Sequence, residues 1–458
     1  MDVRGRRVLV VGAARTGVAV ARTLSGRQAQ VRLVDARPAA ALRDRVNEIP
    51  SAVECRLGDD GPAALDGIDL VVPSPGVPAT APVLADAVAR GVPVWSEIEL
   101  AAALLHCPVV AVTGTNGKST TTTLVGEILG ATGARVFVGG NLGTPLMTAV
   151  DGDWEIAVAE VSSFQLEWVE AFHPVVAAFL NVTPDHLDRH GSLMAYRDLK
   201  ARVFATQTAT DVAVLNRDDP LVWELRDRLR ARVCSFGMTE HAGEGAFVTR
   251  DRIVLRGAEG GAAAEFPSRA VRLRGRHNLE NVMAAILIAR QLGASDDVVA
   301  QVLEQFTGLR HRGELVGEVD GVRYYDDSKA TNVGAVMKSL EGFTEPVILL
   351  AGGLDKDSPF ELLNPLVEAH VRQIVAYGKA AARIAAALGG TAPVVCVDRF
   401  ADAVHEAADV ARAGEAVLLA PACASMDQFA SYAERGAAFR SLVAALGSPA
   451  GAARGERA

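Results

Sequence analysis

The sequence predicts an α/β protein of three domains, each built on a mostly parallel sheet. Three observations support this prediction. Short apolar runs that read as strands alternate with helical stretches along the chain. The 458 residues suffice for about three domains of roughly 150 residues each. Half of the residues are hydrophobic, which is enough to build large buried cores.

The first domain is expected over residues 1–97. A strand at Val8–Val11, a helix at Val18–Leu24 and a second strand at Val31–Val34 form a β-turn-α-β unit. A further apolar run, Leu70–Val72, is expected to add another strand to the same sheet.

The second domain is expected over residues 98–308. Its first strand, Pro108–Val112, is followed by a glycine-containing loop and a helix at Ser119–Leu129. Further elements are expected as strands at Ile156–Glu160, Val176–Leu180 and Val212–Leu215, an antiparallel hairpin within Phe247–Leu255, and a helix at Arg276–Leu292.

The third domain is expected over residues 309–447, and residues 448–458 are expected to form a flexible tail. Apolar runs again alternate with helical stretches, so a parallel sheet is predicted. Ligands of such sheets bind beyond the carboxyl ends of the strands, where the motifs described below lie. The predicted strands are Val322–Tyr325, Val347–Leu350, Ile374–Tyr377, Val394–Val397 and Ala416–Leu419.

Composition excludes several classes of protein. The net charge of −9 argues against a nucleic-acid-binding protein held by phosphate contacts. No run of 18 apolar residues is present, and Val8–Val11 is too short for a signal-peptide core, so neither membrane insertion nor secretion is expected. The five cysteines are scattered without Cys-x-x-Cys spacing, which favours reduced thiols in a cytoplasmic protein.

The strongest local signal is Thr113–Thr120, which reads Thr-Gly-Thr-Asn-Gly-Lys-Ser-Thr between a buried strand and a helix. Backbone N–H groups at such a helix start bind phosphates, the Lys118 ammonium reaches the β- and γ-phosphates, and the Ser119 hydroxyl reaches Mg²⁺. The loop is shorter than the full Walker pattern, because Val112 stands where that pattern has glycine. The alternative is a plain glycine turn. The candidate ATP-binding residues here are Gly114, Thr115, Asn116, Gly117, Lys118, Ser119 and Thr120.

The shortened loop resembles the ATP loop of the Mur ligases and of the related folylpolyglutamate synthases. Further motifs in the same order extend the resemblance over nearly the whole chain. It implies a Rossmann-like N-terminal domain that binds a UDP-sugar, a central P-loop ATPase-like domain, and a Rossmann-like C-terminal domain that binds an amino acid. The match is best to members that join D-glutamate to UDP-N-acetylmuramoyl-L-alanine through an acyl phosphate and a tetrahedral intermediate.

Metal ligands are expected after two strands of the second domain. Glu160 ends one strand, and the loop Asn181–His190 concentrates acids and imidazoles after the next. By itself this loop is equally compatible with a solvated turn. The resemblance implies two Mg²⁺ sites, with Ser119, Glu160 and His186 among the ligands.

Lys200 lies on a predicted helix, Ala195–Phe204, next to Asp198. Its residue type and position alone favour an exposed lysine. The resemblance implies instead that CO₂ carbamylates Lys200, which converts the cation into an anion able to bridge two Mg²⁺ ions. It therefore implies a catalytic set of Lys118, Glu160, His186, Lys200 and Lys329.

Two further stretches are candidates for nucleotide binding. Asn278 and Asn281 lie three residues apart at a helix start, so their amides share one face and suit a purine or ribose. Helix capping by Asn278 is the alternative. The resemblance places adenine contacts at these two residues, and it implies that Arg312 reaches the nucleotide from a hinge that couples ATP binding to domain closure.

Three stretches of the third domain follow strands, namely Asp326–Asn332, Gly352–Lys356 and Pro421–Phe429. Each alone is compatible with a plain strand-to-helix turn. Together they supply helix N-termini, lysines and hydroxyls at one sheet edge, which suits a dicarboxylate amino acid. The resemblance implies that Lys329 lies near the transferred phosphate, and that D-glutamate is held by Thr331, Lys356, Ser425 and Tyr432.

The first domain carries a degraded dinucleotide fingerprint, Gly12–Gly17, in which Ala14 replaces the second glycine. This is weak evidence for NAD, and the resemblance assigns the same geometry to a UDP-sugar. The residues it implies for UDP-sugar binding are Thr16, Asp35, Arg37, Ser74, Gly76, Asn141, Ser162 and Gln165.

Three alternative functions remain open from the sequence. The first is a sister ligase or folylpolyglutamate synthase with another amino acid, against which the stretches Lys329–Asn332 and Ser425–Phe429 favour D-glutamate. The second is an NAD-dependent dehydrogenase, which leaves the phosphate loop unexplained. The third is a non-catalytic nucleotide-binding switch. The resemblance further implies a cytoplasmic monomer with small-molecule substrates.

Overall fold

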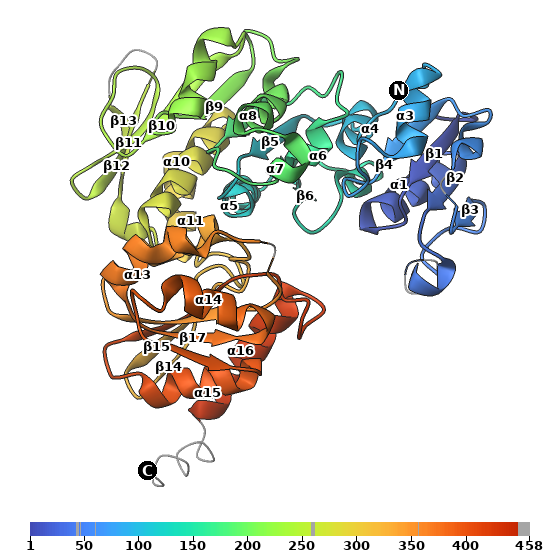
Figure 1. Cartoon of the computed structure of the whole chain (residues 1–458). Coiled ribbons are helices and arrows are strands. Elements are labelled where there is room, and N and C mark those ends of the chain that lie inside the picture. Colours follow the sequence, from blue (N-terminus) through green and yellow to red (C-terminus); the bar gives the residue numbers. More distant parts are fainter. Residues whose placement is uncertain (43–44, 46, 60, 258–261, 356, 448–458) are drawn as a thin grey trace. The chain divides into compact units, whose positions relative to one another are not determined.

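The computed structural model describes residues 1–447 except 43–44, 46, 60, 258–261 and 356, so the predicted tail and Lys356 lie outside the described residues. The chain forms two compact units. The first comprises Met1–Val271 and Glu280–Glu304, and the second comprises Arg272–Leu279 and Gln305–Ala458. Each unit is described separately below (Figure 1).

The first unit begins with a parallel four-stranded sheet of order β3-β2-β1-β4. Its strands are β1 (Arg7–Val11), β2 (Gln30–Asp35), β3 (Glu54–Leu57) and β4 (Leu70–Pro73), with helices α1 (Arg15–Gly26) and α3 (Pro82–Ala89). The predicted β-turn-α-β unit is confirmed by β1, α1 and β2. The edge strand β3 was not predicted, because its sequence Glu-Cys-Arg-Leu lacks an apolar run.

The same unit contains a nine-stranded sheet of order β13-β12-β11-β10-β9-β8-β5-β7-β6. It is parallel except at β11–β12 and β12–β13, which confirms the predicted hairpin. Its strands are β5 (Val109–Thr113), β6 (Val136–Gly140), β7 (Ile156–Glu160), β8 (Val176–Phe179), β9 (Val212–Asn216), β10 (Arg232–Gly237), β11 (Gly245–Thr249), β12 (Arg252–Arg256) and β13 (Ala262–Pro267). Its helices include α4 (Glu97–Leu104), α5 (Lys118–Ala131), α6 (Ser163–Leu166), α7 (Leu187–His190), α8 (Leu193–Ala201) and α9 (Pro220–Trp223). The unit also holds most of α10 (Arg276–Gln291), which begins in the second unit, and of α11 (Asp296–Gln305), which ends there.

The central position of β5 sets the location of the motifs. Every residue of β5 is buried, and the strand pairs in parallel with β7 on one side and with β8 on the other. Val112 pairs with Glu160 and Thr113 pairs with Phe179. The phosphate loop, Glu160 and the loop after β8 therefore leave one edge of the sheet side by side.

The second unit holds a six-stranded sheet of order β14-β15-β19-β16-β17-β18, in which only β14 is antiparallel. The five predicted strands are confirmed. The strands are β14 (Glu314–Val319), β15 (Val322–Asp326), β16 (Val347–Gly352), β17 (Val371–Tyr377), β18 (Val394–Val397) and β19 (Ala416–Ala422). The helices are α12 (Val333–Leu340), α13 (Asn364–His370), α14 (Ala381–Leu388), α15 (Phe400–Val410) and α16 (Tyr432–Leu446).

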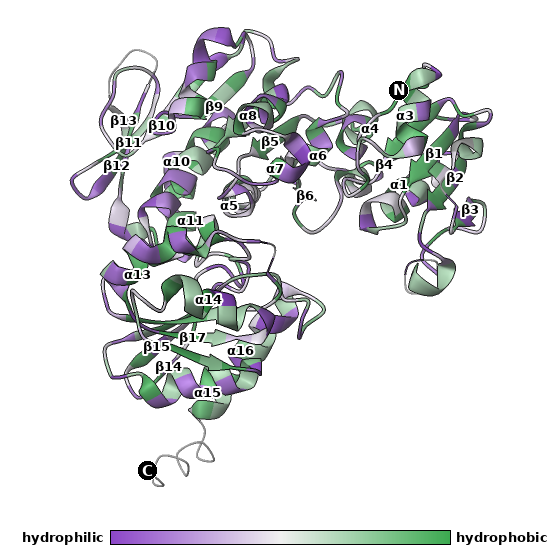
Figure 2. Cartoon of the chain, in the orientation of Figure 1, coloured by the Kyte–Doolittle hydropathy of each residue, from purple (hydrophilic) through white to green (hydrophobic). Residues whose placement is uncertain are grey.

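The central strands β5, β8, β16 and β19 are buried throughout, and hydrophobic residues predominate on them (Figure 2). The predicted fold class, α/β with mostly parallel sheets, is therefore confirmed. No helix in the described part of the chain is long and apolar enough to cross a bilayer. All five cysteines carry free thiols.

We predict that Gly17→Ala destabilises the first sheet, because a Cβ at Gly17 would lie 1.9 Å from the Gly12 carbonyl oxygen. Such overpacking against backbone should lower the free energy of unfolding by about 2 kcal/mol. Gly26→Ala in the same helix is the matched control, because nothing lies within 4 Å of its Cβ position. Urea unfolding measures both variants, and equal effects would contradict this account of α1 packing.

Candidate functional site

The phosphate loop joins β5 to α5, and its conformation requires glycine. Gly114 and Gly117 have φ of 152° and 84°, and Gly117 is the left-handed N-cap of α5. A Cβ at Gly117 would lie 2.1 Å from the Asn281 Oδ1 atom. The Lys118 Nζ atom donates hydrogen bonds to the carbonyls of Gly114 and Thr115, at 2.9 Å each. The loop is therefore a backbone cradle with an ammonium folded over it, as phosphate binding requires.

Glu160 supplies a carboxylate beside this cradle. It is 3 % exposed at the end of β7, where the Ser119 hydroxyl donates to its Oε2 atom. The Asn141 amide donates to its Oε1 atom at 2.6 Å. A serine hydroxyl and a carboxylate are oxygen donors of the kind that Mg²⁺ takes beside a nucleotide. These residues therefore fit a magnesium site.

Lys200 is almost completely buried, at 1 % exposure, so the expectation of an exposed lysine is wrong. Its Nζ atom donates to the Gly114 carbonyl at 2.9 Å and lies 4.6 Å from the centre of the Tyr196 ring. Burial, and secondarily the nearby Lys118 ammonium, hold the pKa of the Lys200 amine well below its usual range. A lowered pKa increases the population of neutral amine, which is the form that reacts with CO₂.

His186 lies in the turn before α7, with a left-handed φ of 53°. Its Nε2 atom is 3.7 Å from the Asp185 Oδ2 atom, and its ring packs edge-on against Phe164 at 4.8 Å. Among the described contacts, none joins the His186 side chain to Glu160 or Lys200. The structure thus places His186 after β8 at the predicted edge, half-exposed beside the other candidates.

The two asparagines of the candidate purine site differ in their surroundings. Asn281 is 4 % exposed and borders Gly117 of the phosphate loop. Asn278 belongs to the second unit, and its amide donates to the Arg274 carbonyl at 2.6 Å. The capping alternative for Asn278 is wrong, because α10 begins at Arg276 and Asn278 lies inside its first turn.

The candidate uridine-side residues surround the turn after β1. Asp35 accepts hydrogen bonds from the Ala13 N–H at 2.8 Å and from the Arg37 guanidinium at 2.8 and 2.9 Å. Burial alone would raise the pKa of Asp35, but these hydrogen bonds outweigh it and lower the pKa to about 2. The Ser74 hydroxyl donates to the Gly12 carbonyl at 2.9 Å. Thr16 lies in the first turn of α1.

Ser162 and Gln165 are also placed at the sheet edge, but here they bond to each other. They form the capping box of α6, in which the Gln165 Oε1 atom accepts from both the N–H and the hydroxyl of Ser162. This capping orders the backbone directly after β7.

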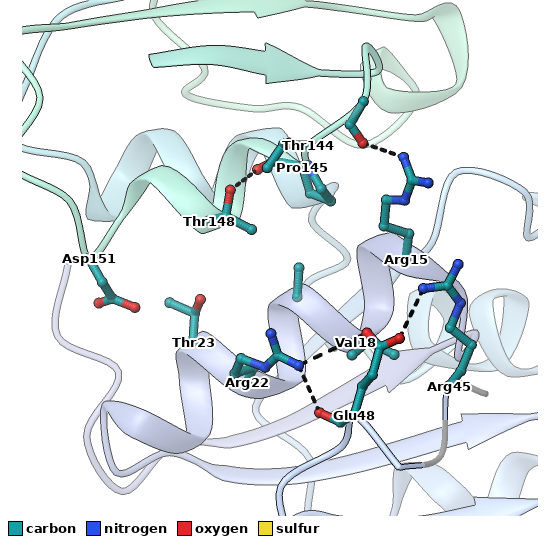
Figure 3. A pocket seen from close by; sticks show the side chains of 12 residues that line it. Arg15, Val18, Arg22, Thr23, Arg45, Glu48, Thr144, Pro145, Thr148 and Asp151 are labelled. Atoms are coloured by element: carbon teal, nitrogen blue, oxygen red, sulfur yellow. Dashed lines mark hydrogen bonds and ion pairs between the residues drawn. The ribbon is translucent and has the colours of Figure 1, made fainter. Parts of the chain in front are cut away.

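A cavity of about 520 Å³ lies between α1 and the segment that follows Asn141 (Figure 3). Arg15 reaches across it and donates to the Gly143 carbonyl at 2.6 Å. Arg22 and Arg45 share the Glu48 carboxylate at its rim. Sequence reasoning missed Arg15, although its position inside the degraded fingerprint was an available signal.

The three candidate loops of the second unit follow β15, β19 and β16, which are adjacent strands. Ser425 is buried, and Tyr432 begins α16. The Lys329 Nζ atom lies 4.2 Å from the centre of the Tyr432 ring. The structure therefore brings Lys329, Thr331, Ser425 and Tyr432 to one edge of this sheet.

A residue missed from the sequence, Arg435, ties these loops together. It is fully buried, and its guanidinium donates to both the Ser328 hydroxyl and carbonyl at 2.9 Å. It also donates to the carbonyls of Cys423 at 3.2 Å and Gly352 at 3.4 Å. No sequence signal separates this arginine from an exposed one, because it belongs to no motif.

Asp327, the first residue after β15, carries a buried carboxyl group. Burial raises its pKa to about 6, although the Ser339 hydroxyl and the nearby Arg312 act in the opposite direction. Arg312 itself lies in the second unit.

We predict that Asp35→Asn lowers the free energy of unfolding by about 2 kcal/mol at pH 7, because it removes the charge and replaces one of two accepting oxygens by an NH2 group that faces donors. The folded pKa of about 2 lies below the ordinary value of 3.8, so the stabilisation is complete above pH 3.8 and is lost as pH falls through 2. Urea unfolding of the variant should therefore vary less with pH across this window. Asp69→Asn, which breaks an exposed ion pair with Arg7, is the control and should lower the free energy of unfolding by less.

Comparisons with known proteins cover nearly the whole chain. Three family models match it in order, described as the Mur ligase MurD-like N-terminal domain over residues 6–96, the Mur ligase middle domain over 112–289, and the Mur ligase glutamate ligase domain over 311–423. Curated relatives named UDP-N-acetylmuramoylalanine–D-glutamate ligase include that of Syntrophus aciditrophicus, 45 % identical over 97 % of this chain and 99 % of its own length. The relative from Geotalea daltonii has the same name, identity and coverage.

Solved structures share the fold at low sequence identity. A UDP-N-acetylmuramate–alanine ligase from Thermotoga maritima superposes with a TM-score of 0.61 at 18 % identity, covering 96 % of this chain and 99 % of its own. A pseudomurein peptide ligase from Methanothermus fervidus has a TM-score of 0.60 at 18 % identity, covering 96 % and 100 %. These structures support the fold, whereas the family models and the 45 % identical curated relatives show that the chain belongs to the Mur ligase family.

Proposed function

We propose that this chain is an ATP-dependent ligase that joins D-glutamate to UDP-N-acetylmuramoyl-L-alanine, a cytoplasmic step of peptidoglycan precursor synthesis. One structural observation supports the proposal most directly. The glycine loop, the Ser119–Glu160 pair and the buried Lys200 converge at one edge of the β7–β5–β8 sheet. The names of the 45 % identical relatives support the choice of both substrates.

The proposal assigns one task to each domain. Residues 1–97 bind the UDP-sugar, residues 98–308 bind ATP and residues 309–447 bind the amino acid. The UDP-sugar contacts are assigned to Thr16, Asp35, Arg37, Ser74, Gly76, Asn141, Ser162 and Gln165. The adenine side is assigned to Asn278, Asn281 and Arg312.

In the proposed reaction, the phosphate loop and Lys118 hold the nucleotide while its γ-phosphoryl group transfers to the substrate carboxylate. ADP leaves, and the amine of D-glutamate attacks the resulting acyl phosphate. A tetrahedral intermediate then collapses to the amide and releases phosphate. Mg²⁺, when held by Ser119, Glu160, His186 and the Lys200 carbamate, would neutralise charge on the phosphoryl oxygens.

The proposed carbamate on Lys200 follows from its burial beside the phosphate loop. The neutral amine attacks CO₂, forms an N–C bond and loses a proton, which leaves an anion in place of a cation. This sign change suits Mg²⁺, because a lysine ammonium repels the ion and a carbamate oxygen binds it.

D-Glutamate binding is assigned to Thr331, Lys356, Ser425 and Tyr432, with Lys329 near the transferred phosphate. Asn332 caps α12 by accepting the Ala335 N–H, which orders the turn that carries Lys329 and Thr331. The N-terminus of α12 adds partial positive charge for a carboxylate. Hydroxyls and ammonium groups at one sheet edge are the donors that a dicarboxylate requires.

We expect phosphate release from ATP and Mg²⁺ only when UDP-N-acetylmuramoyl-L-alanine and D-glutamate are both present. L-Glutamate, L-lysine and meso-diaminopimelate should each fail to support it. Release with another amino acid would move the chain to a sister ligase. A folate substrate supporting release would indicate a folylpolyglutamate synthase, and slow release insensitive to every pair would indicate a nucleotide-binding switch.

The Lys200 carbamate predicts a signal from ¹³C-labelled bicarbonate that is absent from Lys200→Ala. Activity of the wild type should fall when CO₂ is removed and return when bicarbonate is added. Lys200→Ala should lose at least about a hundredfold in kcat, in line with the loss of a preorganised charge-stabilising group. A wild-type enzyme that lacks the labelled signal and is insensitive to CO₂ would contradict the carbamate.

A further inference from the structure

Arg189 joins the N-terminal sheet of the first unit to its central sheet. The side chain is 18 % exposed and uses all three of its guanidinium nitrogens. Its Nε and Nη2 atoms bind the two Glu167 carboxylate oxygens at 2.8 and 2.5 Å. Its Nη1 atom donates to the Pro75 carbonyl at 3.1 Å, and Nη2 also donates to the Val77 carbonyl at 3.0 Å.

The two carbonyls held by Arg189 flank Gly76, which the proposed function assigns to UDP-sugar binding. The loop after β4 is tied from its other side as well, because the Ser74 hydroxyl donates to the Gly12 carbonyl. The guanidinium therefore fixes the backbone on both sides of Gly76. A lysine would supply charge here but not the planar fork that reaches both carbonyls and the carboxylate.

Arg189 also contacts the proposed catalytic region of the central sheet. Arg189 belongs to α7, which begins after His186, and the Arg189 N–H donates to the His186 carbonyl at 3.1 Å. Its guanidinium also stacks over the Phe164 ring at 4.3 Å, and the same ring packs edge-on against His186. One side chain thus contacts the loop around Gly76 and the ring that packs against His186.

We propose that Arg189 is a positioning residue that holds the Pro75–Val77 loop in the conformation that binds the UDP-sugar. This inference rests on the proposed function. Arg189 does not touch the reacting atoms in this assignment; it acts through the backbone on either side of Gly76. Its loss should therefore weaken binding of the UDP-sugar selectively and leave nucleotide binding intact.

The test is calorimetric binding of UDP-N-acetylmuramoyl-L-alanine, without ATP, to the full chain and its variants. Arg189→Met loses two hydrogen bonds to the loop, so its affinity should fall at least about tenfold. The affinity of Arg189→Lys for the UDP-sugar should lie between that of Arg189→Met and that of the wild type. Glu167→Gln, which keeps the loop contacts but weakens their anchor, should show a smaller loss. Binding of ADP with Mg²⁺ should be unchanged in all three variants.

Arg202→Met is the matched control. Arg202 also donates to two carbonyls, those of Glu167 and Val169, and among the described residues none of its hydrogen bonds reaches the Pro75–Val77 loop. It should leave the affinity for the UDP-sugar unchanged.

Two results would overturn the inference. Arg189→Met binding the UDP-sugar as tightly as the wild type would refute it alone. Equal losses of UDP-sugar and ADP affinity in Arg189→Met and Arg202→Met would show a purely structural role. If the wild type itself fails to bind the UDP-sugar, both the proposed function and the inference fail. If the wild type binds and Arg189→Met binds equally well, only the inference fails.

Discussion

The parallel pairing of β5 between β7 and β8 is the constraint on which the catalytic region depends. It fixes where three consecutive chain segments leave the sheet, so the glycine loop, Glu160 and the turn at His186 start from one edge. The burial of β5 makes this pairing insensitive to local surface changes. Neighbouring strand ends thus allow Ser119 to reach Glu160, and Asn141 reaches the same carboxylate from the next strand, β6.

Two basic side chains, Lys200 and Arg435, are buried near the proposed sites for anionic substrates. Lys200 and Arg435 are each about fully buried, and carbonyl or hydroxyl oxygens accept their described hydrogen bonds. Burying a charge is costly, which favours the neutral amine at Lys200 and is offset at Arg435 by hydrogen bonds to carbonyl and hydroxyl oxygens. Their chemistry separates them, because a lysine can lose its proton whereas an arginine stays charged. This difference suits the proposed carbamate at Lys200 and a permanent charge at Arg435, which ties the loops after β15, β16 and β19 together.

The strand alternation and the phosphate loop were predictable because strands buried on both faces are uniformly apolar, as in Val109–Thr113. Strands with polar or glycine residues, such as Glu54–Leu57 and Val136–Gly140, were not predicted. The burial of Lys200 was also invisible. The neighbouring Asp198 suggested that this helix faces solvent. In the fold, the Arg197 guanidinium donates to the Asp198 carboxylate, and Lys200 is buried.

Long-range contacts explain most of what sequence reasoning missed. Arg189 binds carbonyls 114 and 112 positions away in the chain, and Arg435 binds Ser328 at a separation of 107. Backbone carbonyls carry no residue signature, so a pattern of side chains does not reveal them as acceptors. Arg189 lies inside the Asn181–His190 loop, but its contacts were missed because its acceptors come from a distant strand end.

Isotope transfer tests the central claim of carboxylate activation most directly. UDP-N-acetylmuramoyl-L-alanine labelled with ¹⁸O in its carboxylate is turned over with ATP and D-glutamate, and the released phosphate is analysed by mass spectrometry. An acyl phosphate predicts that one ¹⁸O atom passes from the carboxylate to phosphate in each turnover. Amide formation with unlabelled phosphate would show that the carboxylate is not phosphorylated and would contradict the account.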